Sequence, residues 1–136
     1  MSTENQAAIF PKGDMANAAY FTGTAWVNTL VPKDETGSYA VVDVVFEPGC
    51  RNNWHTHAKG QILLITDGKG HYQERGKPAR SIAKGDVLVI PSTVEHWHGA
   101  AKDSSLTHIA VTNIGQEGPV NWLEPVSDEE YNSIGV

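Results

Sequence analysis

The segment YAVVDVVF (residues 39–46) narrows the fold of this chain most, because its side chains alternate between two faces with a period of two residues. Every second residue from Ala40 to Phe46 falls on one face, and that face is wholly apolar. The opposite face carries Asp43, the only charge in the run. We therefore expect a β-strand whose Ala40–Phe46 face points into the protein.

The rest of the chain also reads as short strands joined by turns. Thirteen glycines and seven prolines are spread along it, and no long segment has the 3.6-residue period of a helix. A chain of 136 residues forms one domain with a hydrophobic core of its own. We predict an all-β barrel or jelly roll, with an N-terminal arm over residues 1–19, a single domain over residues 20–136, and an acidic C-terminal segment that ends in a short helix.

Charge and composition exclude several classes of partner. The net charge of −6 argues against nucleic acid and anionic membrane, because neither would meet a basic surface. No apolar run approaches the ~20 residues of a membrane span, and the first residues lack the pattern of a signal peptide. The single cysteine, Cys50, cannot form an intramolecular disulfide, so we expect a cytoplasmic protein. With nucleic acid and membrane excluded, we expect its partner to be a small-molecule substrate.

Five of the six histidines fall in three places: His55 and His57, His96 and His98, and His108. On a strand, His55 and His57 point to the same face with their Cα atoms roughly 6.6 Å apart, so both imidazoles can reach one metal ion. Gln61 follows a short turn and offers a side-chain carbonyl oxygen, and His96 arrives from a separate strand. The predicted site holds one divalent metal ion per chain, and its ligand types suit Mn, Fe, Co, Ni and Zn alike.

Two segments carry a known pattern. GCRNNWHTHAKGQILLITDG (residues 49–68) resembles the first cupin motif, G(X)5HXH(X)3–4E(X)6G, and GDVLVIPSTVEHWHG (residues 85–99) resembles the second, G(X)5PXG(X)2H(X)3N. The resemblance implies a single-domain cupin, that is, a double-stranded β-helix or jelly-roll barrel with a metal in its mouth.

Three positions depart from these motifs. Gln61 stands where many cupins have a glutamate ligand, Thr93 stands at the glycine of the second motif, and Ala100 stands at its asparagine. Replacing glutamate by glutamine leaves the proposed ligand set without an anion. A divalent metal there keeps its full charge and is a better Lewis acid toward a substrate oxygen.

A narrower resemblance covers FEPGCRNNWHTHAKGQILLIT, EHWHGAAKDSSLTHIAV and VNWLEPVSDEEY. These segments are similar to small bacterial cupins that include manganese-dependent hydroxynitrile lyases, which cleave or form aromatic cyanohydrins. The resemblance implies that His55, His57, Gln61 and His96 bind the metal, with Mn as the preferred choice. It also implies that His108 is the general base. The pocket-lining positions that it implies are Val42, Val44 and Thr112.

Strand alternation extends the predicted pocket. Leu63, Ile65 and Ala110 would add apolar wall for an aryl group, and His98 could reach the rim of the site because it lies two residues from His96. If the face that carries Ala110 is interior, His108 is a buried imidazole with a lowered pKa, suited to accept a proton near neutral pH.

Two other functions use the same ligands. One is an Fe(II) dioxygenase or a cupin that converts sugar acids, and the other is a non-catalytic cupin that binds metal or a small ligand. His108 distinguishes the last from a lyase, because a binding protein needs no proton acceptor beside its metal. The apolar positions of YFTGTAWVNTLV (residues 20–31) further suggest a homodimer that pairs through this N-terminal strand.

Overall fold

A computed structural model describes residues 9–114 and 120–134 of the chain. The described residues form strands with two short helices. The strands are β1 (Asp14–Met15), β2 (Phe21–Thr22), β3 (Ala25–Val31), β4 (Tyr39–Phe46), β5 (Arg51–Asn52), β6 (His55–Thr56), β7 (Gln61–Glu74), β8 (Arg80–Ala83), β9 (Val87–Ile90), β10 (His96–Ala100), β11 (Leu106–Asn113) and β12 (Asn121–Trp122). The helices are α2 (Lys33–Thr36) and α3 (Asp128–Asn132).

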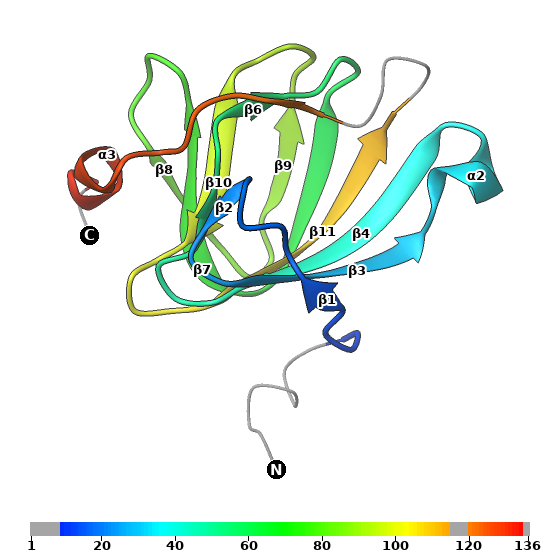
Figure 1. Cartoon of the computed structure of the whole chain (residues 1–136), viewed down its shortest axis with the longest axis horizontal. Coiled ribbons are helices and arrows are strands. Elements are labelled where there is room, and N and C mark those ends of the chain that lie inside the picture. The colour runs from blue at the N-terminus through cyan, green and yellow to red at the C-terminus, as the bar shows by residue number, and fades with distance from the viewer. Residues whose placement is uncertain (1–8, 115–119, 135–136) are drawn as a thin grey trace.

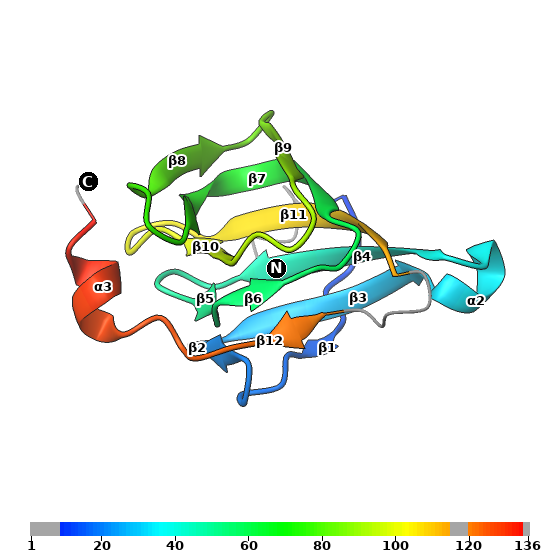
Figure 2. The ribbon, with the colours of Figure 1, turned by 90° about the horizontal axis from the view of Figure 1, so that it is seen from above.

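The strands form two sheets that face each other and share β7 (Figures 1 and 2). One sheet has the order β1-β3-β4-β11-β7-β9, and the other contains β7, β10, β5 and β2, with β8, β6 and β12 paired to its members. All of the pairings are antiparallel. This arrangement confirms the predicted jelly-roll barrel.

Strand β7 passes from one sheet to the other near Gly68. Its first half pairs with β9 and β11, and its second half pairs with β8 and β10. Gly68 has a φ of 74°, and a Cβ atom built there would lie 1.9 Å from the carbonyl oxygen of Ser105. Only glycine fits this crossing point, because it accepts a positive φ and has no Cβ.

The alternation predicted for residues 39–46 is confirmed on its inner side. Val44 and Phe46 of β4 lie in the main hydrophobic core, and Ala40 is also buried. Asp43 faces the other way, as predicted, but it is only 3% exposed. Burial raises the pKa of this carboxyl group above its usual value, so the outer face of β4 is covered more than the sequence suggests.

The two ends of the chain are tied to the barrel. Within the predicted N-terminal arm, β1 pairs with the edge strand β3, while residues 1–8 lie outside the described part. The predicted C-terminal helix is α3, which begins with a capping box between Ser127 and Glu130. A second core cluster anchors this end and contains Trp54, Trp97, Val126 and Tyr131.

Neither of the helices in the described residues is long and apolar enough to cross a membrane.

Candidate metal centre

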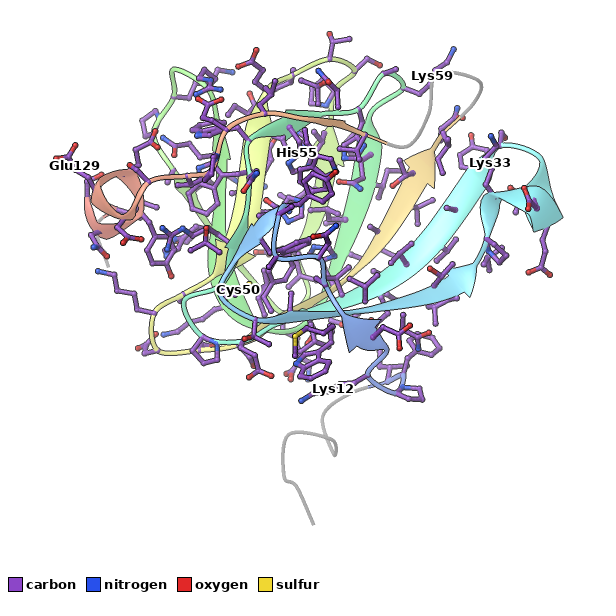
Figure 3. All side chains as sticks on the ribbon, viewed as in Figure 1. Lys12, Lys33, Cys50, His55, Lys59 and Glu129 are labelled. Carbon is purple, nitrogen blue, oxygen red and sulfur yellow. The ribbon has the colours of Figure 1, made fainter. Side chains whose placement is uncertain are left out.

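The first and second histidine pairs meet inside the barrel because β6 pairs with β10. Their antiparallel register sets His55 directly opposite His96, and the centroids of these two rings lie 4.2 Å apart. The ring of His57 lies 5.1 Å from that of His55 and 5.6 Å from that of His96. The three imidazoles predicted from the sequence as ligands are therefore neighbours. Figure 3 shows His55 enclosed by the ribbon, while Lys59 projects outward from the loop after β6.

Backbone carbonyl groups orient two of these rings in the same way. His55 Nδ1 lies 2.7 Å from the carbonyl oxygen of Asn53, and His96 Nδ1 lies 2.8 Å from that of Val94. In each case the carbonyl belongs to the residue two positions earlier, so Nδ1 carries the proton and Nε2 keeps its lone pair. His96 Nε2 is buried and has no hydrogen-bond partner within the described residues. An imidazole fixed in this way is the usual form of a metal ligand.

The side chain of Gln61, like the rings of His55 and His96, is oriented by a hydrogen bond at one end. Its Nε2 donates a hydrogen bond to Thr112 Oγ1 over 2.9 Å, which fixes the orientation of the side-chain amide. The opposite atom, Oε1, is buried and has no hydrogen-bond partner in the described part of the chain. A buried acceptor without a donor is costly unless another group completes it, and a cation does so.

His98 also belongs to the cluster, yet its ring has other partners. One nitrogen each from His55, His96 and His98 lie within 4.8 Å of one another, which is compatible with a shared metal ion. However, Asn52 Nδ2 lies 3.3 Å from His98 Nδ1 and 3.4 Å from His98 Nε2. Asn52 Oδ1 accepts a hydrogen bond from the His98 backbone N–H, so the amide of Asn52 is fixed with its N–H groups toward the ring.

Asn52 Nδ2 lies almost equally far from the two ring nitrogens of His98, so it can donate to whichever of them carries the lone pair. A neutral imidazole has one lone pair, and a metal bond would use it and turn an N–H toward the N–H groups of Asn52. Donation from Asn52 to His98 Nδ1 avoids this conflict. His108 Nε2 also lies 3.3 Å from His98 Nδ1, so His108 and Asn52 are alternative donors to this one lone pair.

His108 lies on the inner wall of the barrel, as strand alternation predicted. It is 1% exposed, sits opposite Val44 on β4 and Ile65 on β7, and contacts the ring of Phe46 at a centroid distance of 5.3 Å. With the proton on Nε2, its lone pair is on Nδ1, a buried atom without a hydrogen-bond partner among the described residues. The ring is thus a proton acceptor that no other described side chain uses.

Burial favours the neutral form of His55, His96, His98 and His108. Desolvation lowers the pKa of His96 and of His108 to about 4. Desolvation, reinforced by neighbouring histidines, lowers the pKa of His55 and of His98 well below the ordinary value. Because a histidine must be deprotonated to bind a metal, the burial suits that role. It also leaves His108 in the neutral form that can accept a proton, while the lowered pKa makes the ring a weaker base than a free imidazole.

Six of the seven predicted pocket residues occupy the same inner wall in three cross-strand rows, and the seventh, His98, lies on β10. Each row joins one residue of β4, one of β11 and one of β7. The rows are Val44, His108 and Ile65; Val42, Ala110 and Leu63; and Ala40, Thr112 and Gln61. Leu63, Ile65, Ala110 and Val44 are buried in the main core, and Val42 packs against it.

Three residues near the site were not predicted from the sequence. Asn52 holds His98, the ring of Trp122 lies 4.9 Å from that of His55, and Tyr20 stacks on Trp122 at 4.6 Å. Trp122 reaches the site because β12 pairs with β6. Asn52 lies close to the histidine motif in sequence, and this proximity was the one available signal.

The donor set fits a divalent cation. His55 and His96 are oriented by backbone groups, and Gln61 and His96 each present a buried acceptor atom that lacks a partner among the described residues. Neutral imidazole and amide oxygen ligands suit Mn, Fe, Co, Ni and Zn, and they do not distinguish among these metals.

Comparison with known proteins places this geometry in a family. The family model described as a cupin domain matches residues 42–112. The chain is 40% identical to an (R)-mandelonitrile lyase of Granulicella tundricola over 114 residues, which cover 84% of this chain and 87% of that protein.

Solved structures agree with this assignment. A cupin-like protein of Thermotoga maritima is 51% identical, with a TM-score of 0.89 over 92% of this chain and 95% of that one. A cupin-2 domain protein of Rhodospirillum rubrum is 18% identical, with a TM-score of 0.67 over 88% and 76% of the two chains, and shows the shared fold alone. The chain belongs to the cupin domain family.

Proposed function

We propose that this chain is a metal-dependent lyase that cleaves and forms aromatic cyanohydrins, with His108 as the general base. The observation that carries the proposal is the position of His108, a neutral buried ring whose free acceptor lies on the same wall as Gln61. The 40% identity to an (R)-mandelonitrile lyase supports the choice of substrate class.

The proposed metal ligands are His55, His57, His96 and Gln61. A bound divalent cation, for which Mn is our first choice, supplies positive charge that stabilises negative charge on a substrate oxygen. Because all four ligands are neutral, none of them offsets this charge. The contact of His98 with Asn52 argues that His98 is not a ligand and that it holds His108 instead.

In the proposed reaction, His108 Nδ1 accepts the proton of the cyanohydrin hydroxyl group. The oxygen then forms a carbonyl double bond, and the carbon–carbon bond to the nitrile breaks with its electron pair leaving on cyanide. The proton on His108 passes to cyanide, which yields an aldehyde and hydrogen cyanide and restores the neutral ring. Formation of the cyanohydrin is the reverse of these steps.

The wall around His108 supports an aryl substrate. The side chains of Val44 and Ile65 flank it across the strands, and Val42, Ala110 and Leu63 form the next row. None of these residues is charged, so the wall favours an uncharged aromatic body over a sugar acid.

The test is mandelonitrile cleavage by metal-stripped protein that has been reloaded separately with Mn, Fe, Co, Ni or Zn. We expect release of benzaldehyde with at least one metal. We also expect His108→Ala to bind the same metal and turn over about 10²–10⁴-fold more slowly, the range for loss of a general base. No cleavage with any metal would reject the lyase, and unchanged turnover in His108→Ala would reject the base.

A further inference from the structure

A pocket of about 420 Å³ lies outside the barrel, between the sheet that contains β8 and the C-terminal helix α3. Its lining comes from β7 and β8, from the loop that follows β10, and from α3 with Ile134 after it. Figure 1 shows α3 on the side of the molecule that carries β8. The volume falls within the roughly 300–1,000 Å³ of small-molecule sites. We call this hollow the outer pocket.

Strand alternation separates the outer pocket from the candidate metal centre. On β7, Tyr72 is buried in the main core and its ring lies 5.8 Å from that of His96. The neighbouring residue, His71, therefore faces the opposite side of the sheet, where it lines the outer pocket. A molecule in this pocket is thus separated from the histidine ligands by the sheet.

Most of the outer pocket is apolar. Ile82, Ala101 and Ile134 line it, and the ring of Tyr131 forms part of its wall. Tyr131 is held in place because its hydroxyl group donates to the carbonyl oxygen of Ala100 over 2.6 Å. This lining suits a ligand with an apolar body.

His71 supplies a hydrogen-bond donor to the pocket. Its Nδ1 is buried without a hydrogen-bond partner among the described residues, which leaves Nε2 as the accessible nitrogen of the ring. For backbone groups, a buried N–H without an acceptor is rarer than a buried acceptor without a donor, and the same preference places the ring proton on Nε2. Burial also lowers the pKa of His71, so the ring is neutral near pH 7.

The charges at the pocket leave one cation without a carboxylate. Lys69, Lys102, Asp86 and Asp103 all line it. Asp103 pairs with Lys69 at 3.7 Å, and Asp86 accepts a hydrogen bond from the backbone N–H of Ala83 over 2.8 Å. Lys102 forms no ion pair within the part of the chain that the structure describes. The outer pocket therefore offers an anion a local site on a chain whose net charge is −6.

We propose that the outer pocket binds a small organic carboxylate whose apolar body is about the size of one ring. The body lies against Ile82 and Tyr131, and the carboxylate accepts from His71 Nε2 and Lys102 Nζ. Both donors border the same ring, because the ring of His71 lies 6.2 Å and Lys102 Nζ lies 5.9 Å from the ring centre of Tyr131. An inorganic anion would leave the apolar lining uncovered. The proposal does not depend on lyase activity, since the two sites lie on opposite sides of the sheet.

The test titrates the full chain with sodium benzoate and follows its backbone amides by NMR, in metal-free and in zinc-loaded protein. We expect shifts at residues 69–71 and 101–103 with a dissociation constant of about 1 mM, equal with and without zinc. Benzamide has the same ring without the charge and should bind at least about 10-fold more weakly. Nitrogen NMR of the His71 ring should find its proton on Nε2.

Three substitutions sharpen the test. Ala83 is exposed and lines the pocket, so Ala83→Trp fills the hollow and should abolish the shifts. Lys102→Gln should weaken benzoate binding about 2–5-fold, the range for an exposed ion pair. Lys84→Gln is the matched control, because it removes the same charge from an exposed residue that does not line the pocket, and it should leave the affinity unchanged.

Five results would each overturn the proposal. They are no shifts at residues 69–71 and 101–103 up to about 20 mM benzoate, shifts confined to the metal centre, unchanged binding in Ala83→Trp, equal losses in the two lysine variants, and benzamide that binds as tightly as benzoate. A His71 proton on Nδ1 would remove the proposed donor and would overturn the proposal as well.

Discussion

The two H-x-H pairs of this chain have the same spacing but different surroundings. His55 and His96 each donate Nδ1 to the carbonyl oxygen two residues earlier, so the same local geometry occurs on β6 and on β10. Among the described residues, the ring of His98, the second member of its pair, meets the side chains of Asn52 and His108 and no such carbonyl group.

This difference shows that spacing alone does not assign a role to a histidine. Spacing determines which rings point inward, and the hydrogen bond at one ring nitrogen determines what the other nitrogen can do. A backbone acceptor leaves a lone pair for a metal, whereas a side-chain donor uses that lone pair. We therefore propose that His55, His57 and His96 bind the metal, whereas His98 holds His108, which accepts the proton.

The largest expected effect comes from removing one histidine of the second pair at a time. His96→Ala should weaken metal binding more than about 100-fold, because it removes a ligand rather than a group behind a ligand. His98→Ala should weaken it less than about 10-fold. Titration of the metal-free proteins against a competing chelator measures both values, and equal losses in the two variants would break the comparison.

Asn52→Ala tests whether His98 positions His108, and we expect a smaller effect from it. Without the amide, His98 loses a donor to its ring and the acceptor for its backbone N–H, so His108 is held less firmly. Mandelonitrile turnover should fall about 10–100-fold, while metal content stays at the wild-type level. If metal is lost in proportion to turnover, Asn52 supports the ligands and not the base.

Asp43 predicts how the stability of the folded protein depends on pH, independently of the histidines. Burial raises the folded-state pKa of this carboxyl group above 3.8, so the folded protein holds a proton that the unfolded chain releases first. Its contribution to stability is present at low pH and is lost as the pH rises through the folded pKa.

Asp43→Asn removes this loss because asparagine stays neutral. The variant should gain more stability over the wild type at pH 7 than at pH 4, as measured by urea unfolding at both pH values on metal-free protein. An equal effect at the two pH values would show that Asp43 does not titrate in this range.

The smallest expected effect concerns the loop that supports His57. Thr93 has a φ of 62°, and its backbone N–H donates to the carbonyl oxygen of His57 over 2.9 Å. A left-handed conformation costs a β-branched residue about 1–2 kcal/mol, and glycine avoids most of that cost but adds up to about 1 kcal/mol of unfolded-state entropy. Thr93→Gly should stabilise the protein by up to about 1 kcal/mol in thermal unfolding, and destabilisation would contradict this reading.

Much of the fold was predictable because it depends on short-range patterns. The alternation in residues 39–46 indicated the inner face of β4, and the two cupin motifs indicated the barrel and the meeting of His55 with His96. Thr93 was recognised as a departure from the glycine of the second motif, and its positive φ gives the physical reason for that glycine.

The rest depended on contacts between distant segments. Trp122 approaches His55 from the C-terminal segment, and the buried state of Asp43 depends on neighbouring strands rather than on its own sequence. The roles of His55 and His96 depend on backbone carbonyl groups, which every residue has and which no sequence pattern marks. The choice of His55, His57, Gln61 and His96 as ligands stays a prediction.

X-ray absorption at the metal edge of the loaded protein tests the central claim most directly, because it counts the imidazoles bound to the metal. We predict three imidazoles on the metal in the wild type and three in His98→Ala, with two in His96→Ala as the matched control. A fourth imidazole in the wild type that disappears in His98→Ala would make His98 a ligand and would contradict the separation of metal binding from proton transfer.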